Sequence, residues 1–211
     1  DFLRKKGIRD KVKIIFTTPI PKLFPFPEAS KFLLNMFEQK SIEHLDPFTI
    51  TSVDTNNKII ESKEGDKIKF DYLFGVPPEI PTKVLRDSGL VDLQSGWVPA
   101  DKFTLRYPKH DDVYVLGDIT NLPVSKAGSV ADAESSIVVS NIVNDIRGYG
   151  LTKQFNGNGL CWVVTRIGEA ATFAFDYSHP PSVVSPPSET NWWLKLIYNR
   201  AYFSLTARVA L

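Results

Sequence analysis

The sequence predicts an α/β protein, and three features of the chain carry this prediction. The first is a helix end at residues 2–6 followed by a strand of β-branched and aromatic residues at 12–16. The second is a helix at 28–39 that places its apolar residues on one face. The third is a buried strand at 113–116 that leads through a Gly-Asp pair into a long helix at 125–147. Strands alternating with helices are typical of a layered α/β fold.

Shorter strands fill the chain between these features. Segments 49–53, 58–61 and 67–70 are separated by turn residues, so we expect an antiparallel meander. A more apolar strand at 71–76 ends at two prolines, which cannot continue a ladder of hydrogen bonds. We expect a domain boundary just beyond them, near Pro81.

The second half begins with short strands expected at 96–98 and 103–105. A hairpin is predicted from two runs, 159–166 and 170–176. A proline-rich connection at 180–187 then leads to an aromatic-rich helix at 190–203. The long helix before the hairpin carries one apolar stripe, formed by Val130, Ala133, Ile137, Val138, Ile142 and Ile146.

Composition excludes several classes of protein. The 211 residues carry 25 basic and 24 acidic side chains, which is unlike the one-signed surface of a nucleic-acid-binding protein. A single cysteine, Cys161, cannot form an internal disulfide, which favours a reducing compartment. No apolar run reaches the roughly 18 to 20 residues of a spanning helix, so we expect any membrane contact to be peripheral. The chain starts at Asp1 without an initiator Met, as the middle of a longer protein would.

The segment around Gly117 and Asp118 is the first candidate site. Glycine lets a ligand approach the backbone, and a carboxylate at a strand end can accept hydrogen bonds from sugar hydroxyls. About eight residues later Lys126, Ala127 and Gly128 open the long helix, whose N-terminus offers N–H groups and the positive end of a dipole. A polyhydroxyl, electron-rich ligand would suit such a site. The alternative is an ordinary Gly-Asp turn after a buried strand.

These residues resemble a known motif. The run from Asp112 to Asp118, the Pro-Val-Ser-Lys-Ala-Gly run at 123–128 and the following helix look like the second FAD-binding motif of the pyridine nucleotide-disulfide oxidoreductase superfamily. Within it, the Lys-Ala-Gly version, the lead-in at 89–98 and the cysteine hairpin look most like sulfide:quinone oxidoreductases and flavocytochrome c sulfide dehydrogenases. The resemblance implies that Gly117, Asp118 and the turn at 126–128 hold FAD, with Asp118 at the ribityl chain.

The resemblance also implies a domain order. Residues 1–80 look like the latter part of a second, NAD-like Rossmann domain, and 81–150 like the returning segment of an FAD-binding Rossmann domain. Residues 151–211 then form a C-terminal hairpin and helix on the quinone and membrane side. The family's Gly-x-Gly-x-x-Gly loop, which cradles the FAD pyrophosphate, has no counterpart in this sequence. The chain therefore looks like the C-terminal half of such a flavoprotein.

Cys161, at the start of the predicted hairpin, is the second candidate. Taken alone, a cysteine flanked by apolar residues is a small buried hydrophobe. The resemblance implies instead a catalytic cysteine beside the flavin, which receives sulfide sulfur together with a second cysteine from the N-terminal half. Relatives without sulfide chemistry can also keep a cysteine at this place.

The helix at 190–203 is the third candidate. Its aromatic residues fit either core packing or, beside Lys and Arg, a membrane interface. By resemblance, Lys195, Tyr202 and Phe203 lie near the flavin and the quinone. The histidines His44, His110 and His179 lack ligand spacing, so no metal site is expected.

The resulting expectation is an FAD-dependent oxidoreductase that passes electrons from sulfide or another small reductant through Cys161 and flavin to a quinone. It implies a cytoplasmic protein bound peripherally to the inner face of the plasma membrane. Two alternatives stay open, namely a type II NADH:quinone reductase in which Cys161 is incidental, and a non-catalytic fragment. Assembly as a homo-oligomer is left open as well.

Overall fold

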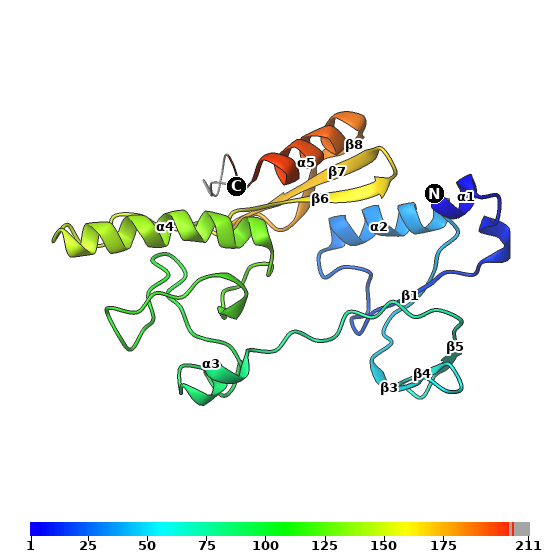
Figure 1. Cartoon of the computed structure of the whole chain (residues 1–211), viewed down its shortest axis with the longest axis horizontal. Coiled ribbons are helices and arrows are strands. Elements are labelled where there is room, and N and C mark those ends of the chain that lie inside the picture. The colour runs from blue at the N-terminus through cyan, green and yellow to red at the C-terminus, as the bar shows by residue number, and fades with distance from the viewer. Residues whose placement is uncertain (203, 205–211) are drawn as a thin grey trace. The chain divides into compact units, whose positions relative to one another are not determined.

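The computed structural model describes residues 1–202 and residue 204, which form a mixed α/β chain (Figure 1). The helices are α1 (Phe2–Lys5), α2 (Pro27–Gln39), α3 (Lys83–Asp87), α4 (Gly128–Ile146) and α5 (Glu189–Ala201), with 3-10 turns η1 (Arg9–Lys11) and η2 (Gly117–Ile119). The strands are β1 (Ile15–Thr17), β2 (Glu43–Leu45), β3 (Ile50–Asp54), β4 (Ile59–Ser62), β5 (Lys67–Lys69), β6 (Gly159–Arg166), β7 (Glu169–Phe175) and β8 (Ser182–Ser188). The described chain contains no helix with both the length and the apolarity needed to cross a bilayer.

The chain divides into two compact units. The first runs from Asp1 to Pro77 and includes the hairpin tip at Val164–Glu169, whereas the second holds Pro78–Val163 and the chain from Ala170 onward. The chain passes between the units at Pro77-Pro78, where two prolines prevent a continuous ladder. Their assignment to particular Rossmann domains stays a prediction.

The first unit contains a parallel pair and an antiparallel meander. Strand β1 pairs in parallel with β2, and helix α2 connects them, with the ring of Phe37 packed edge-on against Phe16 at 5.3 Å. Strands β3, β4 and β5 are antiparallel, as the turn residues predict, and Ile60 at their centre is buried. The helix expected at 28–39 and the meander are confirmed.

Two strand predictions in this unit need correction. The strand predicted at 12–16 is shorter and later, because only Ile15–Thr17 finds a partner in β2. The segment 71–76 forms no strand, and Phe74 and Val76 are 95% and 94% exposed. Its apolar residues lack both a partner strand and a covering layer within the described residues, so hydrophobicity alone does not make a strand here.

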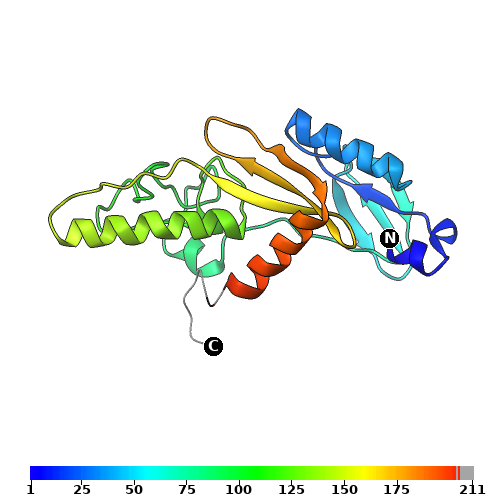
Figure 2. The ribbon, with the colours of Figure 1, turned by 90° about the horizontal axis from the view of Figure 1, so that it is seen from above.

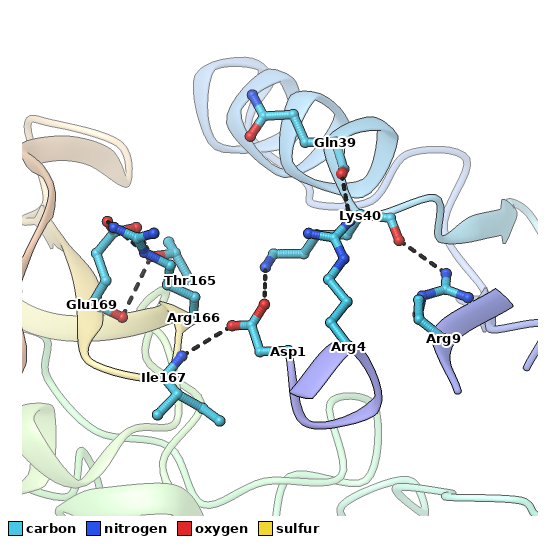
Figure 3. Close-up of polar contacts among 9 residues, drawn as sticks. All are labelled: Asp1, Arg4, Arg9, Gln39, Lys40, Thr165, Arg166, Ile167 and Glu169. Carbon is cyan, nitrogen blue, oxygen red and sulfur yellow. Dashed lines mark hydrogen bonds and ion pairs between the residues drawn. The ribbon is translucent and has the colours of Figure 1, made fainter. Parts of the chain in front are cut away.

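Polar contacts tie the start of the chain to the hairpin tip within the first unit (Figure 3). The carboxylate of Asp1 accepts hydrogen bonds from the Ile167 backbone N–H at 3.0 Å and from the Lys40 ammonium at 3.4 Å. Arg4 and Arg9 donate to the carbonyls of Gln39 and Lys40 at the end of α2. Cations at these carbonyls offset the negative end of the helix dipole.

The second unit is built on α4, which has 19 residues (Figures 1 and 2). Its core packs this helix against the surrounding loops through five buried side chains: Leu105, Leu122, Val130, Val138 and Phe155. The predicted stripe is right at its start only, because Ile142 and Ile146 are exposed. The helix begins three residues later than the expected 125 and ends before Gly148, whose φ of +78° stops it.

The strands predicted before α4 are also wrong. Residues 113–116 are extended, but only one isolated bridge joins them to the rest of the described chain, between Tyr114 and Arg106. Segment 96–98 likewise forms one bridge, between Val98 and Thr120, and 103–105 is a turn. A strand needs a neighbour on at least one side, and these segments find only single-residue partners.

The last sheet and helix follow the prediction with one exception. Strands β6, β7 and β8 lie in that order (Figure 2) and the hairpin is confirmed, whereas the expected proline-rich connection at 180–187 is strand β8. Prolines are tolerated because β8 is an edge strand, and bulges interrupt its pairing with β7. Helix α5 starts where Ser188 accepts a hydrogen bond from the Asn191 N–H.

Candidate functional site

The Gly117-Asp118 turn is fastened to helix α4. Gly117 has a φ of +75°, a left-handed conformation that favours glycine. Its N–H donates to the Glu134 carboxyl oxygen Oε2 at 2.5 Å, and its carbonyl accepts from the Thr120 N–H at 3.1 Å. Asp118 is not on a strand, but its exposed carboxylate lies in the turn next to the first residues of α4.

Lys126 holds the loop between this turn and the helix. Its ammonium donates to the carbonyls of Asp118 and of Thr120, the latter at 2.9 Å. It also lies 3.6 Å from the ring centroid of Trp97, a cation–π contact. Burial lowers the pKa of Lys126, while nearby carboxylates oppose the change. The Lys126 ammonium therefore stabilises the conformation of the loop between Asp118 and the start of α4.

The start of α4 completes this side of the site. Ala127 is the N-cap and Gly128 the first helical residue, and the first helical hydrogen bond runs from the Val130 N–H to the Ala127 carbonyl at 3.0 Å. The N–H groups of Gly128 and Ser129 therefore have no partner inside the helix. A cavity of about 10 Å³ lies under the turn and is lined by ten residues: Gly117, Asp118, Thr120, Val124, Ser125, Lys126, Ala127, Val130, Ala131 and Glu134. The structure thus brings four of the five predicted cofactor-binding residues to one cavity, and the fifth, Gly128, directly follows Ala127 in the chain.

Cys161 lies on β6 and is half-buried. Burial raises the pKa of its thiol, and the hydroxyl of Ser129, in the first turn of α4, opposes the rise. Cys161 therefore lies near the same helix start as Gly128, although it lines neither that small cavity nor the larger pocket described next.

A larger open pocket of about 700 Å³ lies between α4, the β6–β8 sheet and α5. Its walls combine apolar side chains such as Leu160, Phe175 and Val184 with the polar side chains of Asp132 and His179. His179 Nδ1 lies 3.0 Å from Asp176 Oδ1. Polar and apolar residues line this pocket in similar numbers, so it lacks the predominantly apolar walls that are typical of small-molecule sites.

The C-terminal residues divide into two faces of α5. Tyr202 donates to Asp132 on α4 at 3.2 Å, and the Tyr198 ring packs against Trp162 at 5.2 Å, so both tyrosines serve packing. Burial and Asp132 raise the pKa of both tyrosines. Lys195 is half-buried on this helix, and Phe203 lies outside the described residues.

The opposite face of α5 is apolar and exposed. Trp193 and Ile197 are 60% and 59% exposed, and Leu194 and Leu196 join them. Among the described aromatic residues of this helix, Trp193 alone therefore lies on this face.

Sequence reasoning missed Glu134 and Ser129. Glu134 had a signal, because it lies four residues after Val130 and four before Val138 on the apolar stripe. A carboxylate at a core position needs a local explanation. Ser129 carried no such signal, since its relation to Cys161 depends on how the hairpin folds back onto α4. Three or more metal-binding side chains do not gather anywhere in the described part of the chain.

Comparison with known proteins gives the class. No family model matches the chain. It is 32% identical over 180 residues to a mitochondrial sulfide:quinone oxidoreductase of Dictyostelium discoideum, 28% over 191 residues to that of Mus musculus, and 25% over 209 residues to a sulfide-quinone reductase of Aquifex aeolicus. These alignments cover 84%, 88% and 89% of this chain but only 40%, 42% and 46% of the relatives.

Two solved structures share the fold. The sulfide:quinone oxidoreductase of Aquifex aeolicus matches with a TM-score of 0.83 and 20% identity, over 96% of this chain and 52% of its own. A chain in the mitochondrial ATP synthase of Tetrahymena thermophila matches with a TM-score of 0.75 and 18% identity, over 98% of this chain and 51% of its own. The chain is thus related to FAD-dependent oxidoreductases. More narrowly, it is a sulfide:quinone oxidoreductase homologue that covers roughly half of that protein.

Proposed function

We propose that this chain forms the C-terminal half of an FAD-dependent sulfide:quinone reductase and supplies Cys161, part of the FAD site and the quinone side. The observation that carries the proposal is the place of Cys161 in a homologue of these enzymes. The hairpin brings its thiol to Ser129, beside the helix start where the predicted FAD residues gather.

The residues present fit one part of FAD. The exposed Asp118 carboxylate can accept hydrogen bonds from ribityl hydroxyls, and the first turn of α4 offers N–H groups to the electron-rich edge of the ring. When bound, FAD supplies the two-electron redox chemistry. Gly117 contributes a backbone that a ligand can approach. The Lys126 ammonium stabilises the loop by donating to the Thr120 carbonyl.

Cys161 would take part in the oxidised form. Burial raises the pKa of its thiol, which disfavours the thiolate. A disulfide to a second cysteine from outside this sequence removes that obstacle, because the incoming hydrosulfide is then the nucleophile. Its sulfur forms a bond to one cysteine sulfur while the other cysteine leaves as a thiolate. Two electrons from sulfide thereby enter the pair and become available for transfer to the quinone.

The exposed apolar face of α5 is the proposed membrane and quinone side. Trp193 and Ile197 can enter the headgroup boundary, while Arg200 on the same helix meets lipid phosphates. Three of the related enzymes are named as mitochondrial and one is bacterial. A peripheral site at the cytoplasmic face of the plasma membrane or at a mitochondrial membrane fits both groups.

The test is a titration of the full-length, flavin-loaded protein, including the half that supplies the second cysteine, with sulfide in the presence of a soluble quinone. We expect flavin absorption and sulfide-dependent quinone reduction in the native protein, and loss of at least 100-fold (roughly the contribution of a covalent step) in Cys161→Ser with flavin content unchanged. Retention of full sulfide activity would contradict the role of Cys161. Activity with NADH instead of sulfide would favour the NADH:quinone reductase, and a colourless protein the non-catalytic alternative.

A further inference from the structure

Glu134 occupies a core position of α4. It lies one turn after Val130 and one turn before Val138, and the exposed fractions of these three side chains are 0%, 3% and 5%. Acidic side chains are almost never fully buried unless they are paired. A carboxyl group in the middle of an apolar stripe needs partners that justify its burial.

The two carboxyl oxygens of Glu134 differ in their hydrogen-bond partners. Oε2 accepts the Gly117 N–H at 2.5 Å, whereas Oε1 is buried and has no hydrogen-bond partner among the described residues. A buried oxygen without a partner costs about 1–3 kcal/mol. Glu134 also lines the cavity of about 10 Å³ under the turn, together with Thr120 and Lys126. That volume is about the room that one water molecule needs.

We propose that Glu134 is a positioning residue, which fixes the Gly117-Asp118 turn through Oε2 and binds one internal water molecule through Oε1. The water would link the carboxyl group to the polar groups around the cavity. The turn then keeps Asp118 at the start of α4. The consequence for cofactor binding rests on the proposed function, whereas the turn and the water do not.

The charges around the carboxyl group agree with this arrangement. Burial raises the pKa of Glu134, and Asp118 raises it further, while the Gly117 N–H and Lys126 oppose the rise. Burial together with the charges of Glu134 and Asp101 raises the pKa of Tyr177 to about 12, while the Tyr177 hydroxyl donates to the Lys102 carbonyl at 2.7 Å. A protonated Glu134 can donate a hydrogen bond to the water through its O–H group and still accept the Gly117 N–H with the other oxygen.

Three variants of the full chain separate this role from general destabilisation. Glu134→Gln keeps one acceptor and one donor, whereas Glu134→Met keeps the size and removes both. Asn141→Leu is the matched control, because Asn141 is another fully buried polar residue, two turns further along α4, whose hydrogen bonds go to Thr104 and Lys153 instead of the turn.

The main readout is hydrogen exchange of the Gly117 amide, measured by NMR. We expect Glu134→Met to speed this exchange about tenfold, which corresponds to one lost hydrogen bond, and Glu134→Gln to restore it to near the native rate. In Asn141→Leu, the ratio of the Gly117 amide exchange rate to the exchange rates of other amides on α4 should stay at its native value. A native exchange rate in Glu134→Met, or an equal rise of this ratio in Asn141→Leu, overturns the proposal.

Two further measurements complete the test. A high-resolution crystal structure should show an ordered water within hydrogen-bond distance of Oε1, and a dry cavity overturns that part. In titrations with FAD, Glu134→Met should bind about tenfold more weakly than the native protein and Glu134→Gln about equally, because the turn geometry sets the site. If the full-length protein, with its N-terminal half, binds no FAD, the proposed function fails while the exchange and the water still decide this inference.

Discussion

Helices α4 and α5 of the second unit both bury polar side chains and expose apolar ones, but these side chains do different things on the two helices. Helix α4 buries two polar side chains, Glu134 and Asn141, at 0% exposure, while its apolar Ile146 is 82% exposed. Helix α5 buries the polar Asn191 at its first turn and exposes Trp193 and Ile197. Neither helix follows the simple rule that apolar residues are inside.

The difference teaches what each helix does for the site. On α4 the buried polar side chains form hydrogen bonds with backbone atoms of neighbouring loops. The helix thereby fixes the positions of the segments around 104, 117 and 153. On α5 the half-buried tyrosines anchor the helix, and the outer face carries large apolar side chains without a cover in the described chain. Removing a buried polar side chain of α4 should therefore lower the free energy of unfolding, whereas replacing an exposed apolar side chain of α5 should not.

The largest effect is expected for Asn141→Leu. The Asn141 side chain donates to the Lys153 carbonyl and accepts the Lys153 N–H, both at 3.0 Å. Leucine leaves these backbone groups buried and unpaired, so the free energy of unfolding should fall by about 3 kcal/mol. Urea unfolding measures this change. Ser140→Ala loses only a hydrogen bond to the Ser136 carbonyl of the same helix, so it should change the free energy of unfolding by less than about 0.5 kcal/mol. An equal loss in both variants would contradict the role of Asn141 in fixing the neighbouring loops.

The contrast between the helices also shows where sequence reasoning works. Periodicity located α2, α4, α5 and the hairpin, because those elements satisfy most of their hydrogen bonds locally. It failed for 71–76 and 113–116, where a strand depends on neighbours that the local sequence does not specify. The candidate cofactor residues at 117–118 and 126–128 came from a motif, and the structure brings them together. Glu134 and Ser129 depend on how distant segments meet.

The second prediction concerns the pH dependence of stability through Glu134. Its folded pKa is raised above the unfolded value, so its favourable contribution is fully present below the ordinary glutamate pKa and is lost as the pH rises through the folded pKa. Glu134→Gln removes this dependence. We expect the variant to gain stability over the native protein from about pH 4.5 upward, by about 1.4 kcal/mol for each unit of raised pKa.

Thermal or urea unfolding between about pH 4 and 8 tests this sign. The control is Glu38→Gln, an exposed residue on α2, whose difference from the native protein should not grow with pH in the same way. A native protein that becomes more stable than Glu134→Gln as the pH rises would show that Glu134 is stabilised as a carboxylate.

The third prediction concerns the Cys161 thiol. Burial raises its pKa, so alkylation by iodoacetamide should be slower at pH 8 than for an exposed cysteine. The buried Ser129 hydroxyl has no hydrogen-bond partner among the described residues but lies close enough to oppose the rise, so Ser129→Ala should slow alkylation further, by about two- to threefold. Ser135→Ala, whose hydroxyl bonds to the Asp132 carbonyl on the same helix, should leave the rate unchanged. Faster alkylation in Ser129→Ala would mean that Ser129 shields the thiol instead of stabilising its thiolate.

The smallest effect on stability is expected on the outer face of α5. Trp193 and Ile197 are more than half exposed, so changing both to Ser should alter the free energy of unfolding by less than about 0.5 kcal/mol each. Association with liposomes that contain anionic lipids should fall about 30-fold, because the two side chains lose roughly 1 kcal/mol of apolar burial each, or about 2 kcal/mol together. Asn199→Ser on the same helix, also exposed, is the control and should leave binding unchanged. A double variant that loses several kcal/mol of stability would identify these residues as core, and one that binds liposomes like the native protein would remove α5 from the membrane side.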